Sequence, residues 1–489
     1  RGLCHRPVQP YLSAMRNIIP HRVRMLVQTL VIAVYVIFVD LLLQAYLPDI
    51  SKQLGPYVGL IITNCIIMGR AEAYAQSNPP LPAMFDGFFA GLGYAMILLM
   101  ISFIRELLKV TNQPDVISFG GGFPASELFP IEEMKAACDK VLSLYGKKAL
   151  QYATTEGYDP LRQWIADDVN KQGLSVEKDN ILITTGSQQA LDFVGRIFIN
   201  NGDRLLTESP TYLGAIQAWN TYGPIYVTAD TDEDGLVTDN LEFLIRQNIK
   251  FMYVLPNFHN PLGVTMSLER RKKLIELASK YGVPLIEDDP YGKLLFEGEP
   301  ITPIAALDAS YRGCENGKFE GNVIYTSTFS KILAPGIRLA WVIAPSEVIR
   351  KLVLAKQGAD LNTSTFNQLL AYEVGRGGFI DKHVQFIIDV YRERRDAMLE
   401  AMEEHMPAGV RWTHPHGGLF LWLTMPEHLK STEVLQVAVE QEKVACVPGD
   451  AFYPDNGGWN TMRLNFSYSK PTLINEGISR LGRVIKRLL

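Results

Sequence analysis

Residues 327–338 read STFSKILAPGIR, and this stretch decides both the fold and the chemistry expected of the chain. An apolar run at 322–325, NVIY, predicts the strand that leads into it. The hydroxyl groups, the turn amides and Arg338 together favour a phosphate-binding turn. Lys331, set beside such a phosphate, is where a Schiff base to pyridoxal phosphate (PLP) would form. A solvated lysine after a strand is the alternative for this pattern alone.

The chain from residue 113 onward alternates short apolar runs with amphipathic stretches. A helix is predicted over Leu268–Tyr281, with residues 270–273, RRKK, on its solvent side. The alternation predicts an α/β fold: a large domain with a mainly parallel sheet in three layers, then a smaller C-terminal α/β domain read as helix, strand, helix, strand, helix. Strands are predicted at 181–184, 204–207, 251–254, 284–287, 323–326 and 339–342.

Composition bounds the possible functions. At 489 residues, two or three domains are expected, and a net charge of −5 gives no reason to expect a nucleic-acid partner. The five cysteines form no C-x-x-C pair, which argues against a disulfide framework or a self-contained zinc site and favours a reducing compartment. The chain starts at Arg1 rather than Met, as a fragment would, and no signal peptide is recognisable there.

Two motifs follow predicted strands, where sites in open α/β sheets lie. Thr185-Gly186-Ser187-Gln188 opens a helix, so its amides favour an anion site, with an ordinary serine N-cap as the alternative. Tyr212 in the motif SPTY is placed to stack on a pyridine ring, or else to pack in the core.

Two further strand ends carry polar groups. Asn260, in HNPLG, is expected to donate a hydrogen bond to a ring hydroxylate, with a simple turn as the alternative, and neighbouring His259 is assigned a supporting role. Asp288 and Asp289 lack the further ligands of a metal site. Asp288 instead suits pairing with a pyridinium nitrogen, and Tyr291 is placed to reach the ring hydroxyl.

Arg463 lies in an apolar strand, MRLNFS. A guanidinium binds a carboxylate through two parallel hydrogen bonds, so Arg463 is a candidate for a substrate carboxylate. A structural ion pair is the alternative.

Taken together, residues 104–489 resemble the fold-type I, PLP-dependent aminotransferases of class I/II, in the branch with 2-aminoadipate and kynurenine aminotransferases. The resemblance implies Lys331, Asp288 and Tyr291 as catalytic residues, with Lys331 as Schiff-base lysine and proton carrier. It implies cofactor contacts from Ser187, Gln188, Tyr212, Asn260, Asp288, Tyr291, Thr328, Ser330, Lys331 and Arg338. Substrate contacts are implied for Arg463, Tyr152, Asn260, Gly122 and Arg105, with Tyr152 entering from the neighbouring subunit of a homodimer. The motifs that carry it are ISFGGGFPASELFP, LQYATTEGYDPLR, TTGSQQAL, SPTY, HNPLG, EDDPYG, STFSKILAPGIRLAW and MRLNFS.

The implied activity moves an amino group between an L-amino acid of the 2-aminoadipate, glutamate, aromatic or branched-chain type and a 2-oxo acid. Other PLP chemistry on this fold, such as a β-lyase or a decarboxylase, remains open. A ligand-sensing domain of a transcription regulator would need an N-terminal winged helix, which residues 1–105 do not resemble.

The composition changes near residue 105. Residues 25–47 are long and apolar enough to cross a bilayer, with Asp40 as their one charge, and 57–68 and 85–104 are apolar too. Residues 1–108 resemble a truncated D subunit of sodium-translocating NADH:quinone reductase and its Rnf relatives, a membrane electron-transfer subunit. That resemblance implies Cys4 and Cys65 as iron-centre ligands, but the stretch is too short for the six membrane helices of the family.

The expected domains are 1–104, a helical membrane segment; 105–155, an N-terminal arm with part of the small domain; 156–370, the large PLP domain; and 371–489, the small domain. Residues 104–108 fit the motifs of both families, so a true gene fusion and a misassembled gene both remain open. The catalytic part is expected in the cytoplasm, attached to a membrane through residues 23–104 if that segment is genuine.

Overall fold

A computed structural model of the chain describes two long ranges and a few isolated positions. Cys4, Cys65, Asp40 and Arg105 lie outside the described residues, as does most of the expected membrane segment. None of the helices within the described part combines the length and hydrophobicity that a bilayer crossing requires. The described residues are 115–312 and 319–489, with positions 30, 33, 34, 37, 38, 41, 78, 79, 81–83, 85, 86 and 89.

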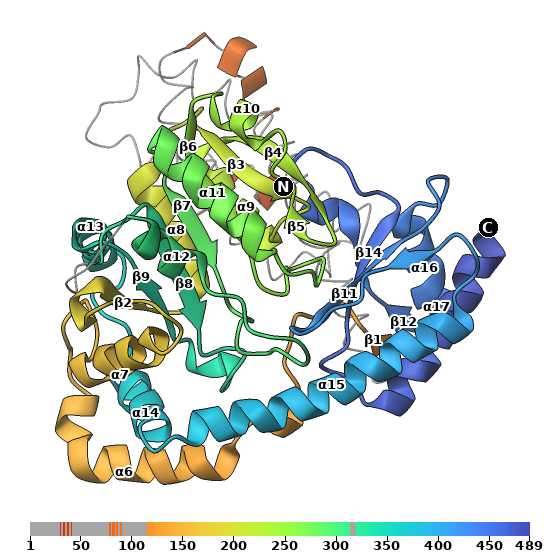
Figure 1. Cartoon of the computed structure of the whole chain (residues 1–489). Coiled ribbons are helices and arrows are strands. Elements are labelled where there is room, and N and C mark those ends of the chain that lie inside the picture. The colour runs from red at the N-terminus through yellow and green to blue at the C-terminus, as the bar shows by residue number, and fades with distance from the viewer. Residues whose placement is uncertain are drawn as a thin grey trace. The chain divides into compact units, whose positions relative to one another are not determined.

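The chain divides into two units, Arg1–Val110 and Thr111–Leu489. The second unit is built on an eight-stranded sheet in the order β2-β9-β8-β7-β6-β3-β4-β5 (Figure 1). Its four central pairings, from β8 to β4, are parallel, whereas β9 and β5 run antiparallel to their neighbours. The strands are β2 (Ile181–Thr184), β3 (Arg204–Ser209), β4 (Ile225–Asp232), β5 (Gly235–Leu236), β6 (Ile249–Val254), β7 (Leu285–Asp288), β8 (Val323–Thr328) and β9 (Ala340–Ile343).

All six predicted strands are present, so the expected mainly parallel sheet is confirmed. Strand β4 was not predicted, because it lies near the sheet edge and carries exposed residues that blur its apolar pattern. Strand β9 is antiparallel because only residues 329–339 separate it from β8, too few for a parallel crossover.

Helices cover both faces of this sheet, so the expected three layers are present. Leu182, Phe251 and Ile286 point to one face, where α8, α9 and α13 pack, and the alternating residues point to the other, where α7, α11 and α12 pack. The helices are α7 (Asp159–Asn170), α8 (Ser187–Phe198), α9 (Leu213–Trp219), α10 (Leu241–Ile245), α11 (Leu268–Tyr281), α12 (Ile304–Tyr311) and α13 (Ser346–Gln357).

Helix α11 has the predicted bounds, but the solvent side assigned to residues 270–273 was wrong for one of them. Arg271 is fully buried. Its guanidinium donates to the Met266 carbonyl (3.0 Å), the Pro256 carbonyl (3.1 Å) and Asn257 Oδ1 (2.6 Å). These acceptors satisfy the buried cation and tie α11 to the loop that precedes Asn260.

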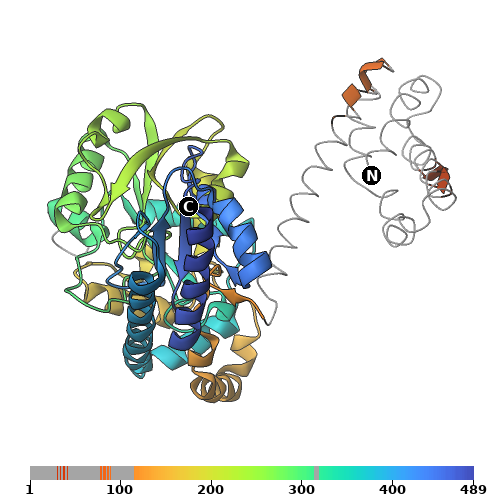
Figure 2. The ribbon, with the colours of Figure 1, turned by 90° about the vertical axis from the view of Figure 1, so that its right-hand side faces the viewer.

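The C-terminal residues form a second, smaller sheet in the order β10-β11-β14-β13. It has more strands than the two expected, because β10 and β13 are two-residue strands that give no periodic signal. Figure 2 shows the long helix α15 beside α17. Helix α17 also packs against α16. The elements are β10 (Arg411–Trp412), β11 (Phe420–Thr424), β13 (Val447–Pro448), β14 (Thr461–Asn465), α15 (Phe379–His405), α16 (Ser431–Glu442) and α17 (Pro471–Leu488).

An N-terminal segment joins this smaller part. Strand β1 (Ile117–Ser118) pairs in parallel with β12 (Val444–Ala445), and the chain then passes to α6 (Ile131–Ala149). Helix α6 packs against α14 (Thr365–Gly375). The glycine run after β1 is thereby held next to β14, where Arg463 lies.

Candidate active site

A cavity of about 500 Å³ lies where the central parallel strands end. That volume suits a cofactor or drug-sized ligand. Tyr152 is not among the residues that line it: its side chain is 79% exposed in this single chain. The predicted site residues that line the cavity are Gly122, Ser187, Gln188, Tyr212, Asn260, Asp288, Tyr291, Thr328, Ser330, Lys331, Arg338 and Arg463.

One end of the cavity is formed by the N-terminus of α8. Its N-cap, Gly186, has a φ of 85° and offers no side-chain cap, so the first amides of the helix lack the usual side-chain acceptor. A Cβ at Gly186 would meet the guanidinium of Arg338, and the positive φ would strain any other residue, so glycine is favoured there. At the same end of the cavity, Ser330 N donates to Thr328 Oγ1 (3.1 Å), which fixes the turn that follows β8.

Asp288 closes the inner end of the cavity. Its side chain is buried, and Tyr253 donates its hydroxyl hydrogen to Oδ2 at 2.8 Å. The other oxygen, Oδ1, has no hydrogen-bond partner among the described residues. Burial raises the pKa of Asp288 to about 7, although the Tyr253 hydrogen bond opposes the shift. A buried carboxylate with a free oxygen is suited to accept a proton or a cationic N–H.

Lys331 projects from the turn after β8. Its Nζ donates to the carbonyl of Gly122 at 2.8 Å and lies 6.0 Å from the ring centre of Tyr291. Burial, with the positive charges of Arg463 and Arg338, lowers the pKa of Lys331 to about 8. Roughly a tenth of this lysine is therefore a neutral amine at pH 7, far more than of an ordinary lysine, and the neutral form is what a nucleophile or base requires.

Arg463, on β14, faces the same cavity. Its guanidinium donates to Asn260 Oδ1 and to the carbonyl of Gly120, both at 2.9 Å, and lies 4.3 Å from the ring centre of Phe420. Buried Nε has no partner within the described ranges. Burial lowers the pKa of Arg463 to about 10, which still leaves it charged at neutral pH. Arg463 makes no ion pair with any residue that the structure describes, because both oxygens that accept from its guanidinium are neutral.

Aromatic and amide groups complete the walls. Tyr291 is buried, which raises its pKa, and its ring packs edge-on against Phe420 at 5.9 Å. Tyr212 precedes α9, and burial also raises its pKa. Gln188 donates to the carbonyl of Gly214 at 2.7 Å, linking α8 to α9.

Glu287 and His259, which are neighbours in sequence of the cavity residues Asp288 and Asn260, contact other parts of the chain instead of the cavity. Glu287 accepts the backbone N–H groups of Ile304 and Ala305, both at 2.8 Å, and so caps α12. His259 Nε2 lies 3.1 Å from Glu208 Oε2, away from the cavity lining. Among the residues that the structure describes, no three His, Cys, Asp or Glu side chains gather to hold a metal ion.

The sequence interpretation missed several residues of this site. Tyr253 sits inside the apolar run of β6, where nothing distinguishes it from a core residue. Phe420 and Leu255 line the cavity but look like ordinary apolar positions. Gly122 was predicted, but the sequence did not indicate that the carbonyls of Gly120 and Gly122 accept hydrogen bonds from Arg463 and Lys331.

Two family models match the chain. Residues 114–481 match "Aminotransferase class I and II", and residues 8–138 match "Rnf-Nqr subunit, membrane protein", so 114–138 fall in both. The first match spans well over half of the chain. The chain belongs to the aminotransferase class I and II family, and it is a PLP-dependent transaminase acting on an amino acid and a 2-oxo acid. Both resemblances expected from the sequence are thus confirmed.

The chain aligns with most of the length of its individual relatives. The chain is 47% identical over 390 residues to "Aromatic-amino-acid aminotransferase 1" of Thermococcus litoralis, covering 78% of this chain and 91% of that protein. It is 43% identical to the "2-aminoadipate transaminase" of Thermus thermophilus, covering 79% and 94%. The solved kynurenine aminotransferase of Pyrococcus horikoshii aligns with a TM-score of 0.75 at 45% identity, covering 79% and 94%.

Proposed function

We propose that this enzyme transaminates amino acids with large side chains, of the aromatic, 2-aminoadipate or kynurenine type, and that the cavity residues carry the reaction. The observation that carries the proposal is the convergence of Lys331, Asp288 and Arg463 on one cavity, where Asp288 and Arg463 each have an unpaired atom among the described residues and Lys331 donates to a backbone carbonyl. The substrate class rests on the relatives, each of which is named for one of these amino acids.

The donor groups fit PLP. The amides of α8 with Ser187, and the guanidinium of Arg338, would hold the phosphate. The unpaired Oδ1 of Asp288 would accept the pyridine N–H, and Asn260 with Tyr291 would hold the ring oxygen. Bound PLP supplies an aldehyde that receives the amino group and a ring that withdraws electrons from the substrate Cα.

The chain's own residues would then orient the substrate and move the proton. Arg463 would bind the α-carboxylate, exchanging a neutral carbonyl for a charged acceptor. Lys331, with its lowered pKa, would take the Cα proton and deliver it to the cofactor side. Tyr212 would cover the ring face, and the negative charge of Asp288 would stabilise a positive charge on the ring nitrogen.

The active form is proposed to be a homodimer. Tyr152 is exposed in the single chain and lies outside the cavity, as expected if it serves a neighbouring subunit. The proposed domains are an arm at 105–155, a large domain at 156–370 and a small domain at 371–489. Size measurement of the purified protein tests the dimer, and mixing Tyr152→Ala with Lys331→Ala subunits tests whether sites are shared.

Residues 1–104 are proposed to be a separate membrane-type unit joined to the catalytic part. The overlap of the two family matches at 114–138 supports a junction close to the start of the catalytic part. Intact-mass analysis and membrane fractionation of the native source test this, since a misassembled gene would yield only the shorter catalytic chain.

The function is tested by the absorbance of the PLP-loaded protein before and after addition of 2-aminoadipate, kynurenine, phenylalanine or leucine. Conversion of the cofactor to its amine form, with release of the matching 2-oxo acid, is expected for a subset of donors. Release of ammonia and pyruvate would indicate a β-lyase, and release of carbon dioxide a decarboxylase; either result would contradict the proposal.

A further inference from the structure

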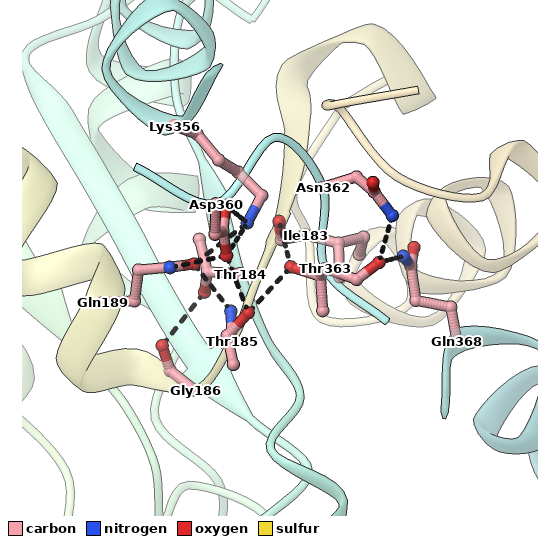
Figure 3. Close-up of polar contacts among 10 residues, drawn as sticks. All are labelled: Ile183, Thr184, Thr185, Gly186, Gln189, Lys356, Asp360, Asn362, Thr363 and Gln368. Carbon is pink, nitrogen blue, oxygen red and sulfur yellow. Dashed lines mark hydrogen bonds and ion pairs between the residues drawn. The ribbon is translucent and has the colours of Figure 1, made fainter. Parts of the chain in front are cut away.

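A polar cluster lies behind the N-terminus of α8, outside the cavity lining. Its members, named the bracing cluster here, are Thr185, Gln189, Lys356, Asp360 and Thr363 (Figure 3). Lys356 comes from α13, which packs against α8, and Asp360 follows the end of that helix. Figure 3 shows Lys356, Gln189 and Thr185 converging on Asp360.

The cluster is saturated with hydrogen bonds. Lys356 is fully buried, and its Nζ donates to Asp360 Oδ1 (2.8 Å), Asp360 Oδ2 (2.9 Å) and Gln189 Oε1 (3.0 Å). Asp360 Oδ2 also accepts from Gln189 Nε2 at 2.8 Å and from Thr185 Oγ1 at 3.1 Å. Asp360 is partly exposed to solvent, and an ion pair with an exposed carboxylate contributes little to stability. Stability alone therefore does not account for this arrangement.

The turn that the cluster contacts has a particular need for support. Residues 185–187 lead from β2 into α8, and a side-chain cap would normally hold such a turn by occupying the first helical amides. Gly186 cannot supply a cap, and an anion at this end of the cavity requires those amides to be free.

The bracing cluster supplies that support from the opposite side. Thr185 N donates to Gln189 Oε1 at 2.9 Å, so the backbone of the turn is bonded to a side chain that Lys356 and Asp360 hold in place. Thr363 Oγ1 lies 3.2 Å from Thr185 Oγ1 and donates to the Ile183 carbonyl at 3.3 Å, which fixes the preceding strand end. None of these bonds uses the amides of Ser187 or Gln188.

We propose that Thr185, Gln189, Lys356 and Asp360 are positioning residues that hold the 185–187 turn in its anion-binding geometry without contacting the anion. The inference rests on the assignment of the cofactor phosphate to the Ser187 end of the cavity, proposed above. It assigns the buried Lys356 to phosphate affinity through the turn rather than to catalysis.

The test separates phosphate binding from all other binding. PLP is removed from the full-length holoenzyme, and the apoprotein is titrated by intrinsic fluorescence with PLP and with pyridoxal, which lacks the phosphate. Thr185→Val removes one hydroxyl at constant shape, and Asp360→Asn removes the central charge. Each is expected to raise the dissociation constant for PLP roughly tenfold and to change that for pyridoxal less than about twofold, as for other residues that orient a ligand's direct contacts.

Asp192→Asn is the matched control. It breaks a carboxylate contact with Arg196 (2.9 Å) on α8 itself, away from the turn, and is expected to leave both constants unchanged. Thr185→Val keeps the test valid if Asp360→Asn does not fold. Equal losses for PLP and pyridoxal, or no loss for either, would overturn the positioning role.

Arg338→Met distinguishes this inference from the assignment on which it depends. If it weakens PLP binding selectively while Thr185→Val and Asp360→Asn do not, the phosphate lies where proposed and the bracing role is wrong. If Arg338→Met affects PLP and pyridoxal alike, the phosphate assignment itself fails.

Discussion

The cavity and the bracing cluster are two polar regions whose charged side chains differ in how fully they are hydrogen-bonded within the chain. In the cavity, Asp288 Oδ1 and Arg463 Nε lack partners among the described residues. In the bracing cluster, Lys356 has an acceptor for each of its three N–H bonds. In the cavity, these unpaired atoms belong to groups that line the space for a ligand, whereas the hydrogen-bonded groups of the bracing cluster contact other parts of the chain.

The largest expected effect comes from the lysine of the cavity. Lys331→Ala removes the group proposed to carry the proton, so turnover should fall by at least roughly 10⁴-fold. Stopped-flow absorbance with a reactive donor measures it. Lys140→Met, which removes a lysine of α6 that pairs with Glu373 of α14, is the control and should retain full activity. Comparable losses of turnover in both variants would contradict a specific role of Lys331 in the reaction.

The next effect tests the saturated side of the comparison. Asp360→Ala leaves the Lys356 cation buried without its carboxylate, which should lower the free energy of unfolding by about 2–4 kcal/mol, given that Asp360 is partly exposed. Lys356→Met in the same chain should recover most of that loss. Urea titrations of the apoprotein measure both, and a double variant no more stable than Asp360→Ala would contradict the ion-pair account.

Removing the carboxylate of Asp288 in the cavity should stabilise the folded protein, whereas removing that of Asp360 should destabilise it. The pKa of Asp288 is raised from 3.8 to about 7 in the folded state, so its protonated form favours folding, and this stability is lost as the pH rises from about 4 through 7. At pH 8, apo Asp288→Asn should therefore be more stable than the wild type by about 1–3 kcal/mol, yet far less active. Denaturant titrations at pH 5 and pH 8 check the sign, and a larger gain at pH 5 would contradict it.

The smallest effect concerns the one partner that Asp288 has. Tyr253→Phe removes the hydrogen bond that favours the carboxylate, so the pKa of Asp288 should rise further, and the acid limb of kcat/KM should move to higher pH by about half a pH unit. Tyr325→Phe is the matched control, because Tyr325 donates to the adjacent Asp289 (3.1 Å) instead. An equal shift of the acid limb in both variants would contradict the role of the Tyr253 hydrogen bond in setting the pKa of Asp288.

Local patterns predicted much of the fold and of the cavity. Lys331, Asp288 and Asn260 each lie at the end of an apolar run with turn residues beside them, so one short window of sequence identifies each. The apolar alternation also gave the central sheet, because buried parallel strands carry continuous hydrophobic runs.

The rest depends on pairings between distant residues. Tyr253 meets Asp288 because β6 and β7 are neighbours in the sheet, and Lys356 meets Gln189 across 167 positions of sequence. No local signal separates such residues from ordinary core or surface positions. Arg271 was placed on the wrong side of α11 for the same reason, since its acceptors lie on loops that the helix pattern does not describe.

The carbonyl of Gly120, bonded to Arg463, has a consequence for selectivity. On the proposed role of Arg463, every ligand competes with an acceptor that the protein already provides. An amino acid amide or ester offers only another neutral oxygen, so it gains nothing by the exchange. A free carboxylate brings a negative charge to the cationic guanidinium and can accept two parallel hydrogen bonds, so it binds more strongly than a neutral oxygen. On this proposed role, the carbonyl of Gly120 would disfavour amino acids whose carboxyl group is blocked, without any steric barrier.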